Sequence, residues 1–432
     1  MRQGAITLAV TIATMLSGHS GVSLANENEN EVETPAPFFN NASLEIWIYG
    51  AYQKHVSHSL LNPGNRIAEL PSWRAATEAR LDLRKDFGAF DVLLAPHLIE
   101  EAYTIQDDDN LAAEGRLRLA QGFVRRKSGS HTFVLGRERL TWGPANFRSP
   151  SNPWYFDSGR TDPLALTHGL DLARVTVGSG QYRTTVGYVA ATREVPTAGP
   201  NRQSAFLKFD QQGSDHLASV VLMKPTEKGE AKDDAFFIGA FAQYSPDDAW
   251  VIYGEFGNGR QPYRLRPTSD SAITLDSPGK RGSAGLIGAS YSQESGKLIF
   301  LEYLHDQGGF SRSERRAWFD SAERAGGALP TAPITAARTL GQLLQFSPRL
   351  LGRNYLWLAW QSNPQIAESI WRAELTVNAD DGSGAAMLYG EKSLGAKVSA
   401  FAVINKNFGS RRTEFGSLTD MHVLAGLKLF AF

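Results

Sequence analysis

Hydrophobic and polar residues alternate with a period of two along several stretches of the chain. In the segment 77–85, alanine and leucine occupy one face, while Arg80, Asp82 and Arg84 occupy the other. Alternation of this kind is typical of a β-strand with one face against an apolar medium and the other against something polar. The same pattern recurs in the segments 115–123, 204–210 and 371–378.

In the segment 115–123, the apolar face is expected to hold Leu117, Leu119 and Phe123, and the polar face is expected to hold Arg116 and Arg118. Such strands run for roughly ten residues, longer than the 5–6 typical of soluble sheets and close to the 9–11 that cross a bilayer. A soluble β-sandwich produces the same alternation. However, the polar faces are rich in arginine, and there are too many of them to lie all on an outer surface.

The connections between the expected strands alternate in length. Transmembrane β-barrels show this asymmetry, with tight periplasmic turns and long extracellular loops, whereas a sandwich has no reason to keep its long loops at one end. Because backbone groups in lipid must be paired internally, only helices and closed barrels span a membrane, and no apolar stretch after residue 25 is long enough for a helix. The short turns fall at 87–89, 126–130, 178–180, 211–215, 245–248 and 293–296, and the long connections lie near 101–114, 140–168, 193–201, 225–233, 258–281 and 306–337.

We therefore expect an all-β fold, a closed antiparallel transmembrane β-barrel with long extracellular loops. The alternating segments give about nineteen candidate strands, and a single-chain bacterial barrel needs an even number. Since the last strand has to end in the periplasm, the segment 339–347 is assigned to an outer loop and not to the wall. This leaves about 18 strands, with 16 as the alternative count.

The N-terminal residues 1–25 combine Arg2, an apolar run and the sequence Ser23-Leu24-Ala25, which is the pattern of a cleaved secretory signal peptide. The apolar run is shorter than the roughly 20 residues of a spanning helix, which argues against a membrane anchor. Residues 26–43 begin with an acidic, asparagine-rich stretch and are expected to be a flexible lead-in. The barrel is then expected to occupy residues 44–432.

The chain ends in HVLAGLKLFAF, with Phe430 and Phe432 two residues apart. This ending resembles the last strand of outer-membrane proteins, and the mature chain resembles the porin-like β-barrels of Gram-negative bacteria. The resemblance implies that the barrel assembly machinery reads Phe430 and Phe432, and that the protein lies in the cell outer membrane among lipid and lipopolysaccharide. It also implies a channel for passive or facilitated diffusion of small hydrophilic solutes.

The longest irregular feature in the first half of the chain is the loop 140–168, which combines prolines with tryptophan, tyrosine and phenylalanine. Aromatic side chains are costly to expose in a surface loop without a use. A barrel of this size has an aqueous lumen, so we expect the loop to fold inward and constrict it, with its aromatics against the wall. Arg148, Asp157, Arg160 and Asp162 would then project into the pore. A cap over the barrel mouth is the alternative, because both kinds of loop are rigid.

The polar faces of two strands place several arginines toward the lumen. Arg80, Arg84, Arg116 and Arg118 are expected to line it, together with Asp82. Rings of arginine in a pore favour anions. Charge pairs that only keep the wall hydrated would look the same in the sequence, and lumen-facing charge is the default in a polar barrel interior.

A second resemblance suggests a different function. Trp142, Gly143 and Pro144 follow an expected strand, and a similar tripeptide follows a strand in barrels of capsule-assembly and polysaccharide-export systems. This resemblance implies a non-conducting surface barrel that binds, anchors or helps export polysaccharide. Bilayer conductance would separate the two functions.

Composition and motifs exclude several other classes. A formal net charge of -1 and a pI near 6.8 provide no field for nucleic acid. The absence of cysteine excludes disulfides, thiol catalysis and iron–sulfur clusters. The histidines lie in no recognisable nucleophile motif, there is no G-x-S-x-G sequence, and the acidic loops 107–110 and 378–384 lack calcium-loop spacing. We therefore expect neither an enzyme nor a bound cofactor or metal.

Overall fold

The computed structural model describes residues 41–105, 111–190, 203–226, 236–260, 265–267, 273–275, 281–365 and 368–431. The expected signal peptide, most of the expected lead-in, the acidic loop 107–110 and Phe432 lie outside the described residues. The predictions for these segments therefore remain predictions.

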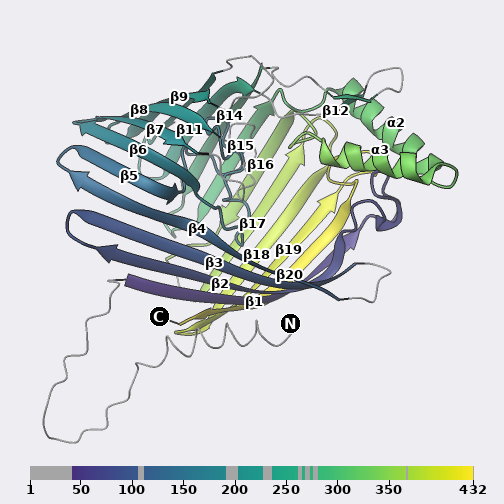
Figure 1. Ribbon diagram of the computed structural model, residues 1–432, viewed down its shortest axis with the longest axis horizontal. Coiled ribbons are helices and arrows are strands. Elements are labelled where there is room, and N and C mark those ends of the chain that lie inside the picture. Colours follow the sequence, from purple (N-terminus) through teal and green to yellow (C-terminus); the bar gives the residue numbers. More distant parts are fainter. Residues whose placement is uncertain are drawn as a thin grey trace, which may run out of the picture. The chain divides into compact units, whose positions relative to one another are not determined.

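Eighteen strands of the described chain form one antiparallel sheet that closes on itself, because β1 pairs with β2 on one side and with β20 on the other (Figure 1). A separate two-stranded hairpin is made by β12 (Leu265–Pro267) and β13 (Ile273–Leu275). The barrel strands are β1 (Asn41–His55), β2 (Pro71–Asp86), β3 (Phe90–Ile105), β4 (Ala112–Ser128), β5 (His131–Glu138), β6 (Leu170–Ser179), β7 (Tyr182–Val189), β8 (Ser204–Gln212), β9 (His216–Pro225), β10 (Phe237–Tyr244), β11 (Trp250–Arg260), β14 (Arg281–Ser292), β15 (Leu298–Asp306), β16 (Asn354–Gln361), β17 (Ser369–Asn378), β18 (Gly384–Gly395), β19 (Val398–Phe408) and β20 (Thr419–Phe430).

The predicted closed barrel of 18 strands is confirmed. Short connections such as 87–89 and 180–181 gather at one end of the barrel, here called the turn end, and the long connections gather at the other, the loop end. The first strand begins at Asn41, three residues before the expected boundary at residue 44. The segment 339–347 lies outside the wall, as predicted.

Two helices occupy the connection between β15 and β16, a feature that the sequence analysis did not identify. They are α2 (Arg312–Ala328) and α3 (Pro333–Gln345), drawn in green at the loop end in Figure 1. A capping box starts α2, because the Ser311 hydroxyl accepts from the amide of Glu314 and the Glu314 carboxylate accepts from the amide of Ser311. Among the described residues, no helix has both the length and the apolar character needed to cross a membrane. A single 3-10 turn, η1 (Pro63–Asn65), lies between β1 and β2.

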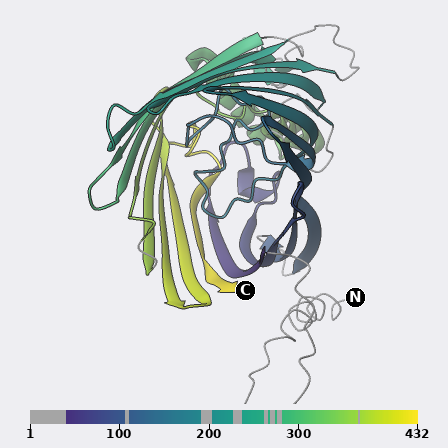
Figure 2. The same cartoon turned by 90° about the vertical axis from the view of Figure 1, so that its left-hand side faces the viewer.

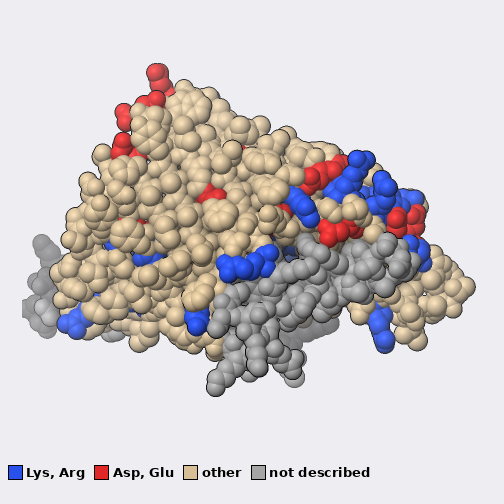
Figure 3. All heavy atoms as spheres, turned by 90° about the horizontal axis from the view of Figure 1, so that it is seen from above, with Lys and Arg blue, Asp and Glu red and all other residues tan. Residues whose placement is uncertain are grey.

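The outer surface of the barrel is apolar around its circumference. Aromatic side chains are exposed near the turn ends of several strands, among them Tyr182, Tyr244 and Trp250. In the view of Figure 3, the wall is largely free of charged side chains, and most of these lie at its margins. An apolar band with aromatic residues at its edge is typical of transmembrane barrels. The exposed aliphatic residues include Ile48, Leu135, Val186, Leu207, Ile252, Ile287, Leu301, Leu358, Leu388 and Ile404.

One expected strand face is wrong. A β-bulge shifts the register between β3 and β4, so that Ala95 pairs with Gln121 but Pro96 pairs with Leu119. An extra residue in one strand turns the following side chains to the other face. Phe123 therefore does not share the outer face with Leu117, and it is buried inside the barrel.

Candidate functional site

The connection between β5 and β6, residues 139–169, enters the barrel and is here called the lumen loop. Figure 2 shows ribbon of this part of the chain inside the ring of strands. Asn152 shapes its central turn, because the Asn152 side-chain oxygen accepts from the amides of Trp154 and Tyr155 while its nitrogen donates to the carbonyl of Leu140. Side-chain hydrogen bonds of this kind replace the regular pairing that its prolines prevent.

The aromatic residues of the lumen loop pack against the inner wall. Trp154 is almost fully buried, its ring lies 5.3 Å from that of Phe206 on β8, and its indole nitrogen donates to Ser204 Oγ at 3.2 Å. Phe147 packs at 6.4 Å against Trp357 on β16. The tryptophan and tyrosine side chains are thus used as wall contacts and are not displayed at the surface.

A buried carboxylate on β11 holds the loop backbone. Glu255 accepts hydrogen bonds from the amide of Ala145 at 2.9 Å, from Ser149 Oγ at 2.7 Å and from Ser151 Oγ at 2.7 Å. Its side chain is almost completely buried. Because three groups of the loop donate to this one buried side chain, Glu255 fixes the position of this turn.

A second carboxylate, on β15, repeats the arrangement. Glu302 accepts from the amides of Asn146 and Phe147 at 2.7 and 2.8 Å and from the hydroxyl of Tyr253 at 2.6 Å. It is 1% exposed, so these donors replace the water that its charge would otherwise require. Both glutamates were missed from the sequence, where the only signal is a lone acid at an inward position of an apolar strand.

Glycines allow the loop to lie directly on the strand backbone. A Cβ atom on Gly239 would stand 2.4 Å from the carbonyl oxygen of Ser151, and one on Gly257 would stand 1.9 Å from that of Pro150. The two glycines are cross-strand partners on β10 and β11. No other residue could occupy these two positions without displacing the loop.

The connection between β15 and β16 covers the lumen loop from the loop end. The guanidinium of Arg349 lies 3.2 Å from the ring centroid of Phe156, and it forms an ion pair with Asp306 at 3.5 Å. Leu350 packs in the same cluster as Phe156. The lumen loop is therefore held both by the wall and by the connection that covers it at the loop end.

On the opposite side of the lumen, the loop reaches β1 and β2. Leu164 packs against the cluster around Trp47, and its carbonyl accepts from Arg80 Nη2 at 2.7 Å. The same guanidinium lies 3.9 Å from the ring centroid of Trp47 and pairs with Glu78 at 2.7 Å. The lumen loop thus spans the interior from one wall to the other.

Two histidines meet where the loop returns to the wall. His97 on β3 lies 3.1 Å from Glu78 and its ring is 5.8 Å from that of His168, near the end of the loop. Burial, followed by the nearby His97 and the charges of Arg118, Arg137 and Arg139, lowers the pKa of His168 to about 4. His168 is therefore neutral at neutral pH.

The four residues predicted to constrict the pore all lie on the lumen loop, in different settings. Arg148 is mostly buried and pairs with Asp157 at 3.4 Å. Arg160 is exposed but donates to the carbonyls of Pro144 and Ala145 at 3.1 and 2.9 Å. Asp162 is exposed and accepts from the amide of Leu164.

The predicted lining residues lie on β2 and β4. Strand pairing places Arg80 and Arg118 on either side of His97, so these three side chains form one row on the inner face. Arg80 is engaged by Glu78, and Arg116 pairs with Glu114 at 2.5 Å. Asp82 and Arg84 follow Arg80 on the same face of β2 by alternation.

A polar cavity of about 240 Å³ remains beside β1, β2 and β20. Gln53, Arg74 and His422 line it. Asp162 of the lumen loop interacts electrostatically with both His422 on β20 and Glu374 on β17, so it faces this side of the lumen. The unfilled polar space thus lies next to the exposed part of the loop.

These features define a closed antiparallel β-barrel with a long loop folded into its lumen. No family model and no curated protein matches the chain. Among solved structures, OccAB1 of Acinetobacter baumannii aligns over 91% of this chain and 98% of its own, with 10% identity and a TM-score of 0.53. OccK5 (OpdH) of Pseudomonas aeruginosa aligns over 91% and 99%, with 11% identity and a TM-score of 0.50.

A mutant of the Rh. blastica porin aligns over 90% of this chain and 99% of its own, with 9% identity and a TM-score of 0.41. At such identities, the likeness to OccAB1 and OccK5 establishes the fold alone.

Proposed function

We propose that the protein is an outer-membrane channel for small hydrophilic solutes and that the lumen loop is its constriction. The observation that carries the proposal is the way in which the loop spans the lumen. Glu255 and Glu302 hold it firmly to one wall, while a polar cavity lined by Arg74 and His422 remains at the other. A loop fixed in this way narrows a wide barrel to a small polar passage.

The apolar outer band supports a membrane location for the barrel. With long connections at one end and short turns at the other, the loop end faces the outside of the cell and the turn end faces the periplasm. Phe430 ends β20 in the wall at the turn end, where the assembly machinery would read it together with Phe432. Lipid and lipopolysaccharide are then the surroundings of the wall.

The charges of the passage support weak selectivity. Arg80, Arg116 and Arg148 each have a carboxylate partner, which offsets their attraction for anions. Arg160, Asp162 and Asp157 are exposed charges on the loop. Asp157 is paired with Arg148, whereas Arg160 and Asp162 have opposite signs and no salt bridge to each other is present among the described contacts. We infer that the channel discriminates mainly by size, with a small preference set by Arg160 and Asp162.

A non-conducting barrel that binds or exports polysaccharide is the second candidate. It is favoured by the amount of protein inside the barrel, because the lumen loop and the connection between β15 and β16 pack together at the loop end. Trp142 of the Trp-Gly-Pro sequence packs at 5.2 Å against Trp154, a contact within the loop that serves either function.

Planar-bilayer recording of the purified full-length barrel separates the two. A channel gives discrete conductance steps that scale with salt concentration. A wild-type barrel that migrates as folded protein on unheated gels but gives no steps would contradict the channel, and binding of capsular polysaccharide would then be measured on the same preparation.

A further inference from the structure

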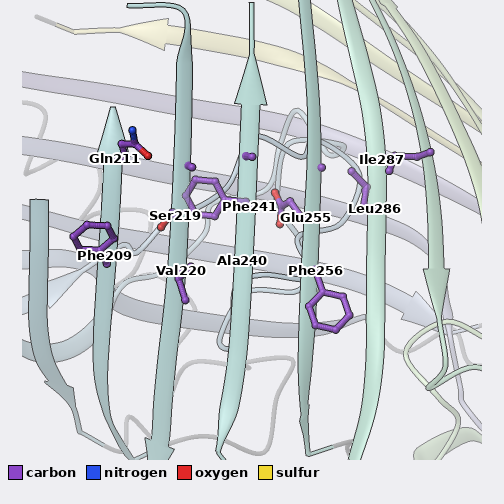
Figure 4. A pocket seen from close by; sticks show the side chains of 13 residues that line it. Phe209, Gln211, Ser219, Val220, Ala240, Phe241, Glu255, Phe256, Leu286 and Ile287 are labelled. Atoms are coloured by element: carbon purple, nitrogen blue, oxygen red, sulfur yellow. The ribbon is translucent and has the colours of Figure 1, made fainter. Parts of the chain in front are cut away.

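A hollow of about 560 Å³ interrupts the outer face of the wall across β8, β9, β10, β11 and β14, and we call it the wall hollow (Figure 4). Its floor is made of small residues. The strand register places Ala218 opposite Ala242, and Ala242 opposite Gly254. Ala240 extends the hollow toward the loop end. Small side chains on three neighbouring strands leave a depression that is absent where aliphatic residues occupy the same rows.

Large apolar side chains and the amide of Gln211 surround this floor. In Figure 4, Phe209 and Val220 lie on one side of it and Phe256 and Ile287 on the other. Among the described residues that line the hollow, Glu255 is the single charged one, and its carboxylate is turned to the lumen loop on the other face of the wall. Beyond the residues that line the hollow, the neighbouring outward-facing rows of the wall hold large side chains, with Leu222 paired with Ile238 and Tyr244 paired with Ile252.

The wall hollow lies back to back with the loop anchor. On the inner face of the same two strands, the lumen loop rests on Gly239 and Gly257, where a Cβ would meet its backbone. Glu255, which holds the loop, follows Gly254 of the floor. Between the outer hollow and the inner loop there is little more than the backbone of β10 and β11.

The dimensions and chemistry of the hollow decide what fills it. It is roughly 19 Å wide across five strands and roughly 7 Å long, from strand spacing and rise. This area is far below the about 800 Å² per partner that a stable protein interface needs, whereas the volume suits one small ligand. In a bilayer, the groups beside an apolar wall are hydrocarbon chains.

We propose that the wall hollow binds one acyl chain of an outer-membrane lipid and that the bound chain supports β10 and β11 where the lumen loop is anchored. This inference rests on the membrane location proposed above. Phospholipid and lipopolysaccharide both carry such chains, and the experiment below distinguishes them.

The test fills the hollow without touching the lumen. In Gly254→Leu, the new Cβ would meet only the carbonyl oxygen of Leu286, at the ordinary contact distance of 3.5 Å, so the side chain occupies the floor. The matched control is Gly50→Leu, since Gly50 is exposed on β1 and a Cβ there meets nothing within 4 Å. Ala242→Leu is a second filling variant and replaces Gly254→Leu if that chain does not fold.

Native mass spectrometry of barrels extracted in mild detergent counts the lipid that each retains. Wild type and Gly50→Leu are expected to keep one lipid per barrel. Gly254→Leu and Ala242→Leu are expected to retain at least fivefold less lipid per barrel. The retained mass separates phospholipid from lipopolysaccharide, and adding phosphatidylethanolamine or lipopolysaccharide to stripped protein confirms the source. Folding is checked by migration on unheated gels.

Two results would overturn the proposal. One is equal lipid retention by wild type and both filling variants. The other is loss of an oligomer in the filling variants with unchanged lipid, which would make the hollow a contact between copies of this chain. Conductance is recorded on the same samples, so that failure of the channel proposal is seen separately. If the channel holds, Gly254→Leu is expected to conduct with noisier open states than Gly50→Leu.

Discussion

The lumen loop contacts opposite sides of the barrel in different ways. On the anchored side, formed by β10, β11, β15 and β16, buried Glu255 and Glu302 accept hydrogen bonds from loop amides and hydroxyls. On the cavity side, formed by β1, β2 and β20, Leu164 packs against the cluster around Trp47 and its carbonyl accepts from Arg80, and no buried carboxylate of the described residues holds the loop there in the way that Glu255 and Glu302 do. A polar cavity remains there beside Arg74 and His422.

This difference separates the contacts that fix the loop from the side chains that would meet a solute in the proposed channel. A hydrogen bond to a charged group contributes about 1.5–3 kcal/mol, and a buried donor left without an acceptor costs about 1–3 kcal/mol. Several hydrogen bonds converge on each anchoring glutamate, whereas the cavity side is lined by partly exposed polar side chains such as Arg74 and His422. The anchored side therefore sets the position of the loop, and in the proposed channel the cavity side would determine what passes.

Removing the lumen loop abolishes the difference between the anchored side and the cavity side, and it has the largest expected effect. Excision of residues 142–155 deletes every loop hydrogen bond to Glu255 and Glu302, while the bond from Tyr253 to Glu302 and the strand pairing stay intact. Because closure entropy changes slowly with loop length, the wall is expected to stay folded and single-channel conductance to rise severalfold. Unheated gels check the fold. An excised barrel that folds and conducts no more than wild type would show that the lumen is blocked elsewhere.

Releasing the anchors without shortening the chain is expected to have the next largest effect. In the double variant Glu255→Ala and Glu302→Ala, buried loop donors lose their acceptors at about 1–3 kcal/mol each. The loop is then expected to become sensitive to limited proteolysis and the channel to fluctuate between wider and narrower states. Glu294→Ala, in an exposed turn, is the matched control. Wild-type protease resistance in the double variant would contradict the assigned role.

Acid is expected to loosen the end of the loop to a smaller extent. Released His168 has the ordinary pKa of 6.5 and packed His168 has a pKa of about 4, so the released loop binds more protons between these values. The stabilisation is therefore complete above pH 6.5 and is lost as the pH falls toward 4. Proteolysis of the loop should increase in wild type as the pH is lowered from 7 to 4.5, and the increase should be smaller in His168→Asn. The control is His216→Asn on β9, which should show the same increase as wild type.

The smallest expected effect comes from reversing single charges of the lumen loop, which tests which of them face the passage on the cavity side. Reversing the exposed charge in Arg160→Glu is expected to shift ion selectivity toward cations, measured as a reversal potential under a salt gradient. Arg148→Glu should shift it less, because Arg148 is mostly buried and already paired with Asp157. An equal shift from both variants would place Arg148 in the passage beside Arg160.

The strand wall was predictable because its signal is local. Alternation in segments such as 371–378 and the contrast between short and long connections depend on neighbouring residues. These patterns give about nineteen candidate strands, and the count of 18 also required that the number be even and that the last strand end in the periplasm. The bulge between β3 and β4 was not predictable in this way, since an extra residue such as Ala120 looks like any other in an alternating strand. It reversed the face of Phe123.

The anchoring role of Glu255 was not predictable from the sequence for a different reason. Glu255 contacts loop residues more than a hundred positions earlier in the chain, so nothing beside it in the sequence marks its role. The helix α2 could have been found, because Ser311 and Glu314 form a recognisable capping-box pattern before an amphipathic stretch. The lack of alternation over 306–337 indicates only a long connection.

The seam between β1 and β20 also constrains how the protein is made. Gln53 donates a hydrogen bond to Thr419, 366 residues away, and the whole of β20 pairs with β1. The first strand therefore has no partner on one side until β20 has been synthesised. Contacts of such sequence separation slow folding, and two unpaired strand edges are prone to aggregate. A chain that lost its last strand would keep both edges open, and it would need a chaperone, not a membrane, as its next partner.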